Sequence, residues 1–476
     1  MCKVYLSLLL TTLFFTLNAQ SKITHEEEID QLFKNYTPQT PGVAVGILKN
    51  GKFIFQKGYG AANLEYDIPI TPTTVFHVAS VSKQFTAFAI YLLANEKRLS
   101  LEDDVRKYIP ELPDYGTTMK IKHLLAHTSG LRDQFALLLS AGWDMSDVMT
   151  KTQILNMVFA QKALNFEPGS RFQYSNTGYT LLAEIVERVS HQSLNEFCQE
   201  RIFQPLEMQH TQFYDDYKKV VKNRAYSYEL RDNLYVKKKL NYSHVGATSL
   251  FTTVEDLAKW ANNYEEPKVG NPKLLQAFNE PSILNNGKAT VWKVIGNDTL
   301  LHAKGQFIRD YRGVKIFKHG GHDAGYRTFL ARFPEEVLTI ITLSNDEHYE
   351  IFARGLDIAE FYLKDQLQAK EVIESSPSQM TKKSFDMTTI DLKKYEGKFY
   401  SEELKTTYVL KVIDQQLWIQ HQRLKDMQLS PIAENKFWST NYFSFNLEFI
   451  EEQGDIKGFE LSNFGLKNLF FERHKK

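Results

Sequence analysis

The chain has 476 residues, of which 43% are hydrophobic, and its 57 basic residues balance its 57 acidic residues. This length allows two or three domains with a large buried core. The charge balance gives no reason to expect a nucleic acid or an anionic membrane surface as a partner.

The N-terminus has the pattern of a secretory signal peptide. Lys3 gives it a basic start, residues 4–17 are almost wholly apolar, and Ala19 offers a cleavage point before Gln20. A membrane anchor is the alternative, although the apolar stretch is short for a membrane span. We therefore expect a signal peptide over residues 1–19, a periplasmic or secreted mature protein, and no membrane span after signal removal.

Two strands and a helix are predicted in the first hundred residues. Residues 43–48 and 52–57 predict strands joined at Asn50-Gly51, a strong hairpin signal. From residue 80 onward the apolar residues recur at helical spacing, which predicts a strongly amphipathic helix.

Two reactive side chains stand at the start of this helix. Ser80 and Lys83 are three residues apart, so they share one helix face. A serine hydroxyl is a poor nucleophile at neutral pH and needs a nearby base, and a lysine can be that base when burial lowers its pKa. The N–H groups of a helix N-terminus also favour the negative oxygen formed when a serine attacks a carbonyl. The pair indicates nucleophilic catalysis, although a lone Ser-x-x-Lys motif is weak.

Two further motifs follow along the chain. A Tyr-x-Asn motif at residues 174–176 directly precedes a predicted helix, and a His-Gly-Gly motif at residues 319–321 precedes a second predicted hairpin over residues 327–333 and 337–343. Strands at both ends of this region, with helices between them, indicate an α+β fold with one antiparallel sheet.

The C-terminal part has a different composition. Residues 370–387 are rich in Ser, Pro, Gln and Lys and predict a linker. Beyond them, β-prone runs such as residues 408–412 and 443–447 alternate with polar turns. Residues 388–476 therefore predict a small antiparallel β-barrel or sandwich. Restricting access to a cleft, binding a partner and stabilising the chain all remain open as its role.

In this order, the three motifs resemble the penicillin-recognising serine hydrolases, and most closely the class C β-lactamase, DD-peptidase and esterase branch. Residues 123–131 (HLLAHTSGL) and 167–169 (EPG) agree with that branch, and the resemblance covers roughly residues 25–365. It implies an antiparallel sheet flanked by helices plus an all-helical lobe, with the active site in the cleft between them. It places a cofactor-free serine hydrolase domain over residues 20–369.

The resemblance also implies roles for the motif residues. Ser80 attacks a carbonyl and becomes acylated, with Lys83 or Tyr174 as the base, and the sequence does not decide between the two. A phenol near a lysine cation is expected to ionise well below its free pKa of about 10. Asn176 would orient the substrate and the lysine, with capping of the following helix as its alternative role.

Substrate binding is implied for His319, Gly320, Gly321 and His322. Many relatives carry lysine in place of His319, and a histidine is mostly neutral at pH 7. This weakens the case for substrates with a carboxylate and leaves esters, amides and N-terminal D-residues. The glycines are expected to let the backbone approach a ligand, and the N–H groups of Ser80 and His322 to form an oxyanion hole.

Three other residues are interpreted as structural. Cys198 is the only cysteine after the predicted signal peptide. It follows Phe197 in a helix-like stretch and is interpreted as a buried apolar side chain. His123 and His127 are four apart, as in zinc-binding helices, but Leu124 stands where a metalloprotease has its glutamate. We interpret both histidines as turn-stabilising and expect no metal.

The sequence thus predicts an exported serine hydrolase that acts through an acyl-enzyme. Its expected substrates are small amides or esters, namely D-amino-acid peptides, esters or β-lactams, with cell-wall peptides as candidates. A catalytically silent sensor of the penicillin-binding type is the alternative. The four intact residues Ser80, Lys83, Tyr174 and Asn176 favour the enzyme.

Overall fold

The computed structural model describes residues 25–295, 298–369, 391–439 and 444–474. The predicted signal peptide and linker lie outside these ranges. Within the described part of the chain, no helix is both long and apolar enough to cross a membrane.

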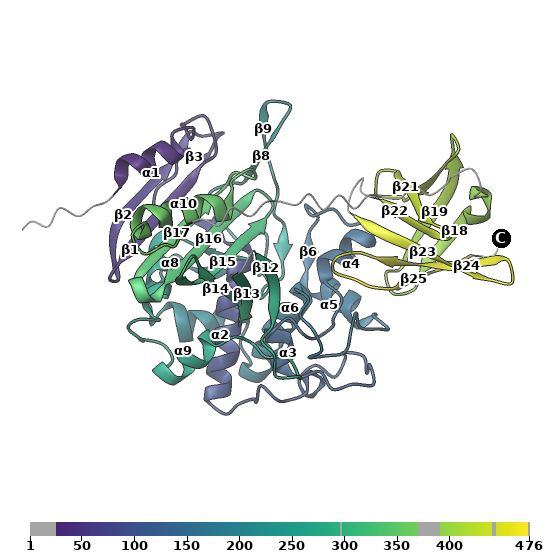
Figure 1. The fold of residues 1–476 in the computed structure, drawn as a ribbon, viewed down its shortest axis with the longest axis horizontal. Helices are drawn as coiled ribbons and strands as arrows, with labels where there is room; N and C mark the ends of the chain where they lie inside the picture. The colour runs from purple at the N-terminus through teal and green to yellow at the C-terminus, as the bar shows by residue number, and fades with distance from the viewer. Residues whose placement is uncertain (1–24, 296–297, 370–390, 440–443, 475–476) are drawn as a thin grey trace, which may run out of the picture.

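An eight-stranded antiparallel sheet forms one half of the N-terminal portion (Figure 1). Its strand order is β12-β13-β14-β15-β16-β17-β1-β2. The strands are β1 (Val43–Lys49), β2 (Lys52–Tyr59), β12 (Val291–Ile295), β13 (Asp298–Ala303), β14 (Gln306–Tyr311), β15 (Val314–Asp323), β16 (Tyr326–Phe333) and β17 (Leu338–Ser344). Both predicted hairpins are confirmed. In addition, β1 pairs with β17, so strands from the start and the end of the N-terminal portion lie side by side in one sheet. Asn50 and Gly51 have φ of 51° and 72°, as a tight hairpin turn requires.

Helices cover both faces of the sheet because its strands are apolar on both sides. On one face α1 (Glu26–Phe33) and α10 (Ile351–Leu363) pack against side chains such as Val45 and Ile340. On the other face α8 (Val254–Asn262) packs against Leu48 and Ile341. Successive strand residues point to opposite faces of the sheet, so this arrangement buries both sets.

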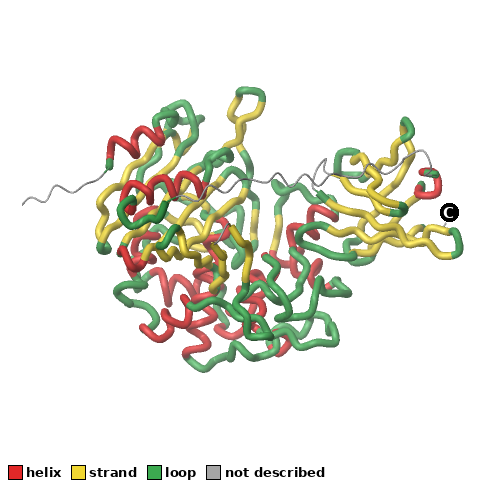
Figure 2. The backbone as a smooth tube through the Cα atoms, viewed as in Figure 1, coloured by secondary structure: helices red, strands yellow, loops and turns green. Residues whose placement is uncertain are grey.

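A mostly helical lobe forms the second half of this portion (Figure 2). Its helices are α2 (Ser82–Asn95), α3 (Ile121–Leu125), α4 (Gln134–Ser140), α5 (Lys151–Phe159), α6 (Asn176–Ser190), α7 (Leu194–Cys198) and α9 (Pro272–Asn279). Short strands join them, namely β3 (Ala61–Asn63), β4 (Ile68–Pro69), β5 (Phe76–His77), β6 (Met149–Thr150), β7 (Gln212–Phe213), β8 (Tyr228–Arg231), β9 (Leu234–Lys237), β10 (Tyr242–Ser243) and β11 (Leu250–Thr252).

The predicted helix after Ser80 is α2, but its amphipathic character was predicted wrongly. Every residue from Ser82 to Ile90 is buried, so the helix runs through the core and not along its surface. Its polar side chains find partners inside the protein. Thr86 Oγ1 donates to the Gly246 carbonyl at 2.8 Å, and Gln84 Oε1 accepts from the Trp260 indole at 3.0 Å.

The C-terminal segment forms a closed eight-stranded antiparallel barrel, which confirms the predicted β-structure. Its strands are β18 (Gly397–Ser401), β19 (Thr406–Ile413), β20 (Gln416–Gln420), β21 (Met427–Ala433), β22 (Lys436–Ser439), β23 (Phe445–Glu452), β24 (Asp455–Ser462) and β25 (Leu469–Arg473). Aromatic side chains such as Phe399, Tyr408 and Phe459 fill the interior and are fully buried. A barrel of eight strands is just wide enough to be filled in this way.

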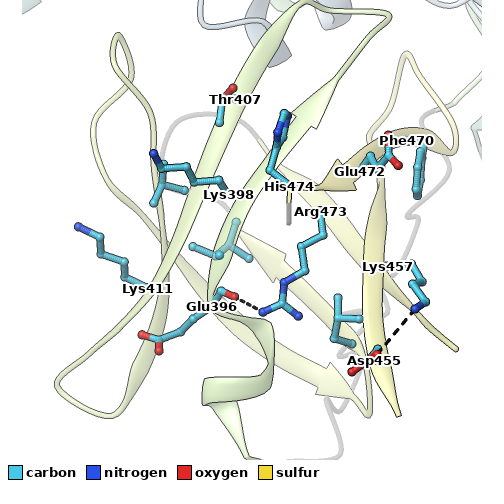
Figure 3. A pocket seen from close by; sticks show the side chains of 14 residues that line it. Glu396, Lys398, Thr407, Lys411, Asp455, Lys457, Phe470, Glu472, Arg473 and His474 are labelled. Carbon is cyan, nitrogen blue, oxygen red and sulfur yellow. Dashed lines mark hydrogen bonds and ion pairs between the residues drawn. The ribbon is translucent and has the colours of Figure 1, made fainter. Parts of the chain in front are cut away.

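A groove of about 1180 Å³ lies along β18, β19, β24 and β25 of the barrel (Figure 3). Side chains of both charges line it, among them Lys411, Asp455 and Arg473. None of the predicted catalytic residues belongs to this groove.

Candidate active site

Ser80 lies in a tight turn just before α2. A 3-10 turn over Ala79–Val81 carries it, and the helix proper begins at Ser82. Ala79 has a φ of 48°, a left-handed conformation that is costly for an alanine and is typical of functional sites. The side chain of Ser80 is only partly buried, so a substrate can reach its hydroxyl.

Lys83 is fully buried beside this hydroxyl. Its Nζ lies 3.1 Å from Ser80 Oγ, 2.8 Å from Asn176 Oδ1 and 2.6 Å from the Ala247 carbonyl oxygen. Burial lowers the pKa of Lys83 to about 7, against the opposing charges of Asp323 and Asp133. A neutral amine has two N–H groups and one lone pair. Because Asn176 and Ala247 accept the two hydrogens, the lone pair is left facing Ser80.

Tyr174 lies next to Lys83 and Ser80. The Lys83 Nζ is 4.9 Å from the centre of the Tyr174 ring, and the ring stacks on His127 with centres 4.2 Å apart. Burial raises the pKa of Tyr174 well above its ordinary value, although a hydrogen bond with Ser80 opposes this shift. The expected lowering of this pKa was therefore wrong, since a water-poor site penalises the phenolate more than the nearby amine favours it.

Asn176 is the first residue of α6, and its side chain does not cap the helix. Its Oδ1 accepts from Lys83, while its Nδ2 donates to Asp133 Oδ2 at 2.9 Å. The same carboxylate oxygen accepts from the Asn176 backbone N–H at 2.6 Å. Asp133 thus supplies the cap, and the amide of Asn176 is free to orient Lys83.

His319 lies on β15 and is almost completely buried. Its Nδ1 donates to the Gly320 carbonyl at 2.6 Å, and its ring centre is 6.4 Å from that of Tyr174. Burial, reinforced by the Lys83 charge, lowers the pKa of His319 to about 3. The histidine is therefore neutral at pH 7, in line with the expectation from sequence.

The two glycines after His319 lie in close contact with other parts of the protein. A Cβ on Gly321 would lie 2.3 Å from the Val78 carbonyl oxygen, and one on Gly320 would lie 2.7 Å from the Phe352 ring. Both glycines thus allow close packing of protein against protein, and their expected role in letting a ligand approach stays a prediction. The contact at Gly321 brings β15 against the turn that carries Ser80, next to the N–H of His322, whose side chain is exposed.

Sequence reasoning missed four residues that contact the predicted ones. Asp133 and the Ala247 carbonyl hold Asn176 and Lys83, and His127 was interpreted as a turn residue although it stacks on Tyr174. Trp292 on β12 also stacks on Tyr174, with ring centres 5.7 Å apart, and its side chain is 47% exposed. Only His127 lay in a motif that could have drawn attention to it.

The structure bears out the interpretation of Cys198. Its side chain is fully buried, and burial raises the pKa of the thiol well above its ordinary value, which excludes a reactive thiolate. Among the residues that the structure describes, no three His, Cys, Asp or Glu side chains are placed together to hold a metal ion.

Comparison with known proteins gives consistent matches. Residues 29–361 match the family model described as Beta-lactamase. Protein flp of Staphylococcus aureus (strain MRSA252) is 30% identical over 331 residues, which span 67% of this chain and 63% of that protein. Penicillin-binding protein 4* of Bacillus subtilis (strain 168) is 28% identical over 436 residues, spanning 88% of this chain and 92% of that protein.

Some solved structures align over nearly the whole chain, the barrel included. The octameric penicillin-binding protein homologue from Pyrococcus abyssi aligns over 96% of this chain and 99% of its own, with a TM-score of 0.62 and 24% identity. At this identity the likeness concerns the fold alone.

Proposed function

Because the chain belongs to the Beta-lactamase family over residues 29–361, we propose that it is an exported serine hydrolase working through an acyl-enzyme on Ser80. Export rests on the predicted signal peptide, and the chemistry rests on the site. The sensing role considered as an alternative has no observation of its own in its favour.

One observation carries the proposal, namely the contact between Lys83 and Ser80. A lysine amine that is buried, 3.1 Å from a serine hydroxyl and lowered to a pKa of about 7 can act as a base at neutral pH. We assign Lys83 as the base that takes the Ser80 proton. The raised pKa of Tyr174 makes its phenol a proton donor in the free enzyme, which suits protonation of the leaving group.

In the proposed reaction Ser80 Oγ forms a bond to the substrate carbonyl carbon while its proton passes to Lys83 Nζ. The N–H groups of Ser80 and His322 stabilise the negative oxygen. The bond to the amine or alcohol breaks as that group receives the Ser80 proton back from Lys83 by way of Tyr174, which leaves the acyl group on Ser80. Lys83 then takes one proton from an attacking water and returns it to Ser80 Oγ as the ester bond breaks, so the acid leaves and the serine hydroxyl is restored.

The surroundings of the site favour substrates that are uncharged next to the scissile bond. His319 is neutral, so it offers no fixed positive charge to a carboxylate. The exposed face of Trp292 beside Tyr174 offers an apolar surface instead. We therefore propose esters and amides with an apolar acyl group, including N-terminal D-amino-acid amides, ahead of D-alanyl-D-alanine peptides and β-lactams.

The proposal is tested by turnover of a substrate panel with the purified mature protein and its Ser80→Ala variant. The panel holds a p-nitrophenyl ester, a D-alanine p-nitroanilide, a D-alanyl-D-alanine peptide and a chromogenic cephalosporin. We expect the first two to be turned over, with loss of all measurable turnover in Ser80→Ala and an acyl adduct on Ser80 by mass spectrometry. Turnover that persists in Ser80→Ala would refute the assignment, and a well-folded wild type that turns over nothing would favour the sensor.

A further inference from the structure

The carboxylate of Asp133 accepts several hydrogen bonds next to the contact between Lys83 and Asn176. Its side chain is 1% exposed. Oδ2 accepts from both the backbone and the amide of Asn176, and Oδ1 accepts from the N–H groups of Phe135 and Ala136 at the start of α4. The carboxylate therefore fixes which side of the Asn176 amide faces Lys83. With Nδ2 held by Asp133, only Oδ1 is left to accept from the lysine.

Residues of the barrel also bind the two-residue segment Arg132–Asp133. The Asp133 N–H donates to the Gly465 carbonyl at 2.8 Å. Arg132 forms a buried ion pair with Glu403 at 2.6 Å, and its second nitrogen donates to the Lys467 and Asn468 carbonyls at 2.9 and 3.1 Å. We call Glu403 and residues 463–468 the barrel clamp.

The helix that Asp133 caps is also part of the barrel core. Ala136 and Leu137 of α4 are fully buried among the barrel side chains, and the Tyr408 hydroxyl donates to the Ser140 carbonyl at 2.8 Å. Figure 1 shows α4 lying directly beside the barrel strands. Both ends of α4 are thus fixed by the barrel, and neither end is free to move with the helical lobe alone.

We propose that Asp133 is the positioning residue of the Lys83–Asn176 pair and that the barrel clamp holds Asp133 in place, so that the barrel sets the catalytic rate. This inference rests on the proposed hydrolase function. It gives the barrel a role beyond those left open by the sequence. The filled barrel interior argues against a ligand cup, and the groove on the barrel contains none of the clamp residues.

The first arm of the test replaces Asp133 by asparagine. An amide has only one acceptor oxygen. When this oxygen caps α4, the NH2 group faces the two donors of Asn176, so the amide of Asn176 loses its fixed orientation. In Asp133→Asn we expect kcat to fall at least 100-fold and KM to change less than threefold. The midpoint of the pH–rate profile should move to lower pH, because the Asp133 charge raises the pKa of Lys83.

Thr253→Ala is the control for loss of a helix cap. Thr253 is fully buried and caps α8 by accepting from the Asp256 N–H at 3.1 Å, without contact to the site. We expect Thr253→Ala to lower thermal stability with kcat and the pH midpoint unchanged. If Asp133→Asn behaves in the same way, Asp133 has a structural role only and the inference fails.

The second arm compares Glu403→Gln with Glu402→Gln. Glu403 is 8% exposed and paired with Arg132, whereas its neighbour Glu402 is exposed. We expect Glu403→Gln to lower kcat about tenfold and Glu402→Gln to leave it unchanged. The Asp133→Asn/Glu403→Gln double variant should be no worse than Asp133→Asn, since both act on one segment. A loss of thermal stability in Glu403→Gln at unchanged kcat would overturn the role of the barrel.

A readout that needs no turnover separates this inference from the proposed function. Amide hydrogen exchange across residues 172–180 should be faster in Glu403→Gln and Asp133→Asn than in wild type, and unchanged in Glu402→Gln. If the wild type lacks serine-dependent turnover, the proposed function fails while the exchange result still decides whether the clamp acts. Unchanged exchange in both variants would refute the clamp whatever the activity.

Discussion

At the scale of single residues, the site depends on the environment of one lysine. Lys83 is held by two acceptors, Asn176 Oδ1 and the Ala247 carbonyl, and its third direction faces Ser80. Burial makes the amine a base near neutral pH, and the same burial keeps Tyr174 protonated and His319 neutral. Burial in one region therefore sets the protonation states of all three side chains.

The pKa of Lys83 predicts how activity depends on pH. The base must be neutral, so kcat/KM for an uncharged ester should rise with pH through a midpoint of about 7 and then level off. Lys83→Arg keeps the positive charge at every accessible pH and should lose about 100-fold or more of kcat/KM. A flat profile between pH 5 and 9 would exclude Lys83 as the base.

The same pKa predicts a change of stability with pH. Between about pH 7 and about pH 10, the unfolded chain binds a proton on Lys83 that the folded chain does not, so stability rises with pH in this window. Lys83→Met removes the group at similar volume. The difference in free energy of unfolding between Lys83→Met and wild type, measured by urea denaturation, should therefore shrink as the pH rises. A constant difference would contradict this prediction.

His319→Lys tests substrate choice. The new ammonium group can pair with a carboxylate next to the scissile bond, so KM for such substrates should fall about tenfold relative to neutral ones. Thermal stability should also fall, because a second amine enters the buried region of Lys83. His210→Lys is the control, since that histidine is exposed and has no role in the site, so the change should alter neither quantity.

At the scale of elements, β15 and the turn before α2 are fitted to each other at Gly321. The strand approaches the Val78–Ala79 backbone so closely that no side chain fits between them. This contact brings the strand that carries the N–H of His322 against the turn that carries Ser80. The strained φ of Ala79 at the same place shows that packing, and not local preference, holds the turn.

A pair of alanine variants tests this fit. Gly321→Ala would press a Cβ against the Val78 carbonyl oxygen, so the strand must move away and kcat should fall at least 100-fold. In Gly320→Ala the new Cβ meets the end of the Phe352 ring and, at 3.4 Å, the Ile351 side chain. The Phe352 side chain is 46% exposed and can turn aside. We expect a loss of less than fivefold there. Equal losses in the two variants would show that the contact at Gly321 has no special role.

At the scale of the whole molecule, the barrel and the hydrolase portion share buried side chains. Ala136 and Leu137 of α4 lie in the barrel core, and Arg132 pairs with Glu403 across the junction. A surface that buries an ion pair and apolar side chains together holds two parts firmly, since separating them exposes both.

This sharing predicts one cooperative unfolding transition. Loss of activity and loss of barrel structure should coincide on heating, and Leu137→Ala should destabilise both by about 2–5 kcal/mol. Calorimetry measures the unfolding of the barrel and of the rest of the chain, and an assay on heated samples measures the loss of activity. Ile413→Ala, at an exposed position on β19, should change little. Two separate transitions in the wild type would show that the barrel unfolds on its own.

The family match confirms the resemblance drawn from the motifs, and much of the fold also followed from sequence. The Asn50-Gly51 hairpin, the helix after Ser80 and the C-terminal β-structure were predicted because turn chemistry and apolar spacing are local signals. The order of the three motifs likewise identified Ser80, Lys83 and Asn176, which the structure brings within hydrogen-bonding distance.

Only the tertiary structure decided the properties that depend on surroundings. The pKa directions of Lys83 and Tyr174 follow from burial, and α2 is buried on all sides because the lobe and sheet enclose it. Asp133 escaped notice because Asn176, the partner that links it to the site, is 43 residues away in sequence. The sequence determines which groups are present and how each segment folds, whereas their protonation and orientation arise from contacts that exist only once the chain has folded.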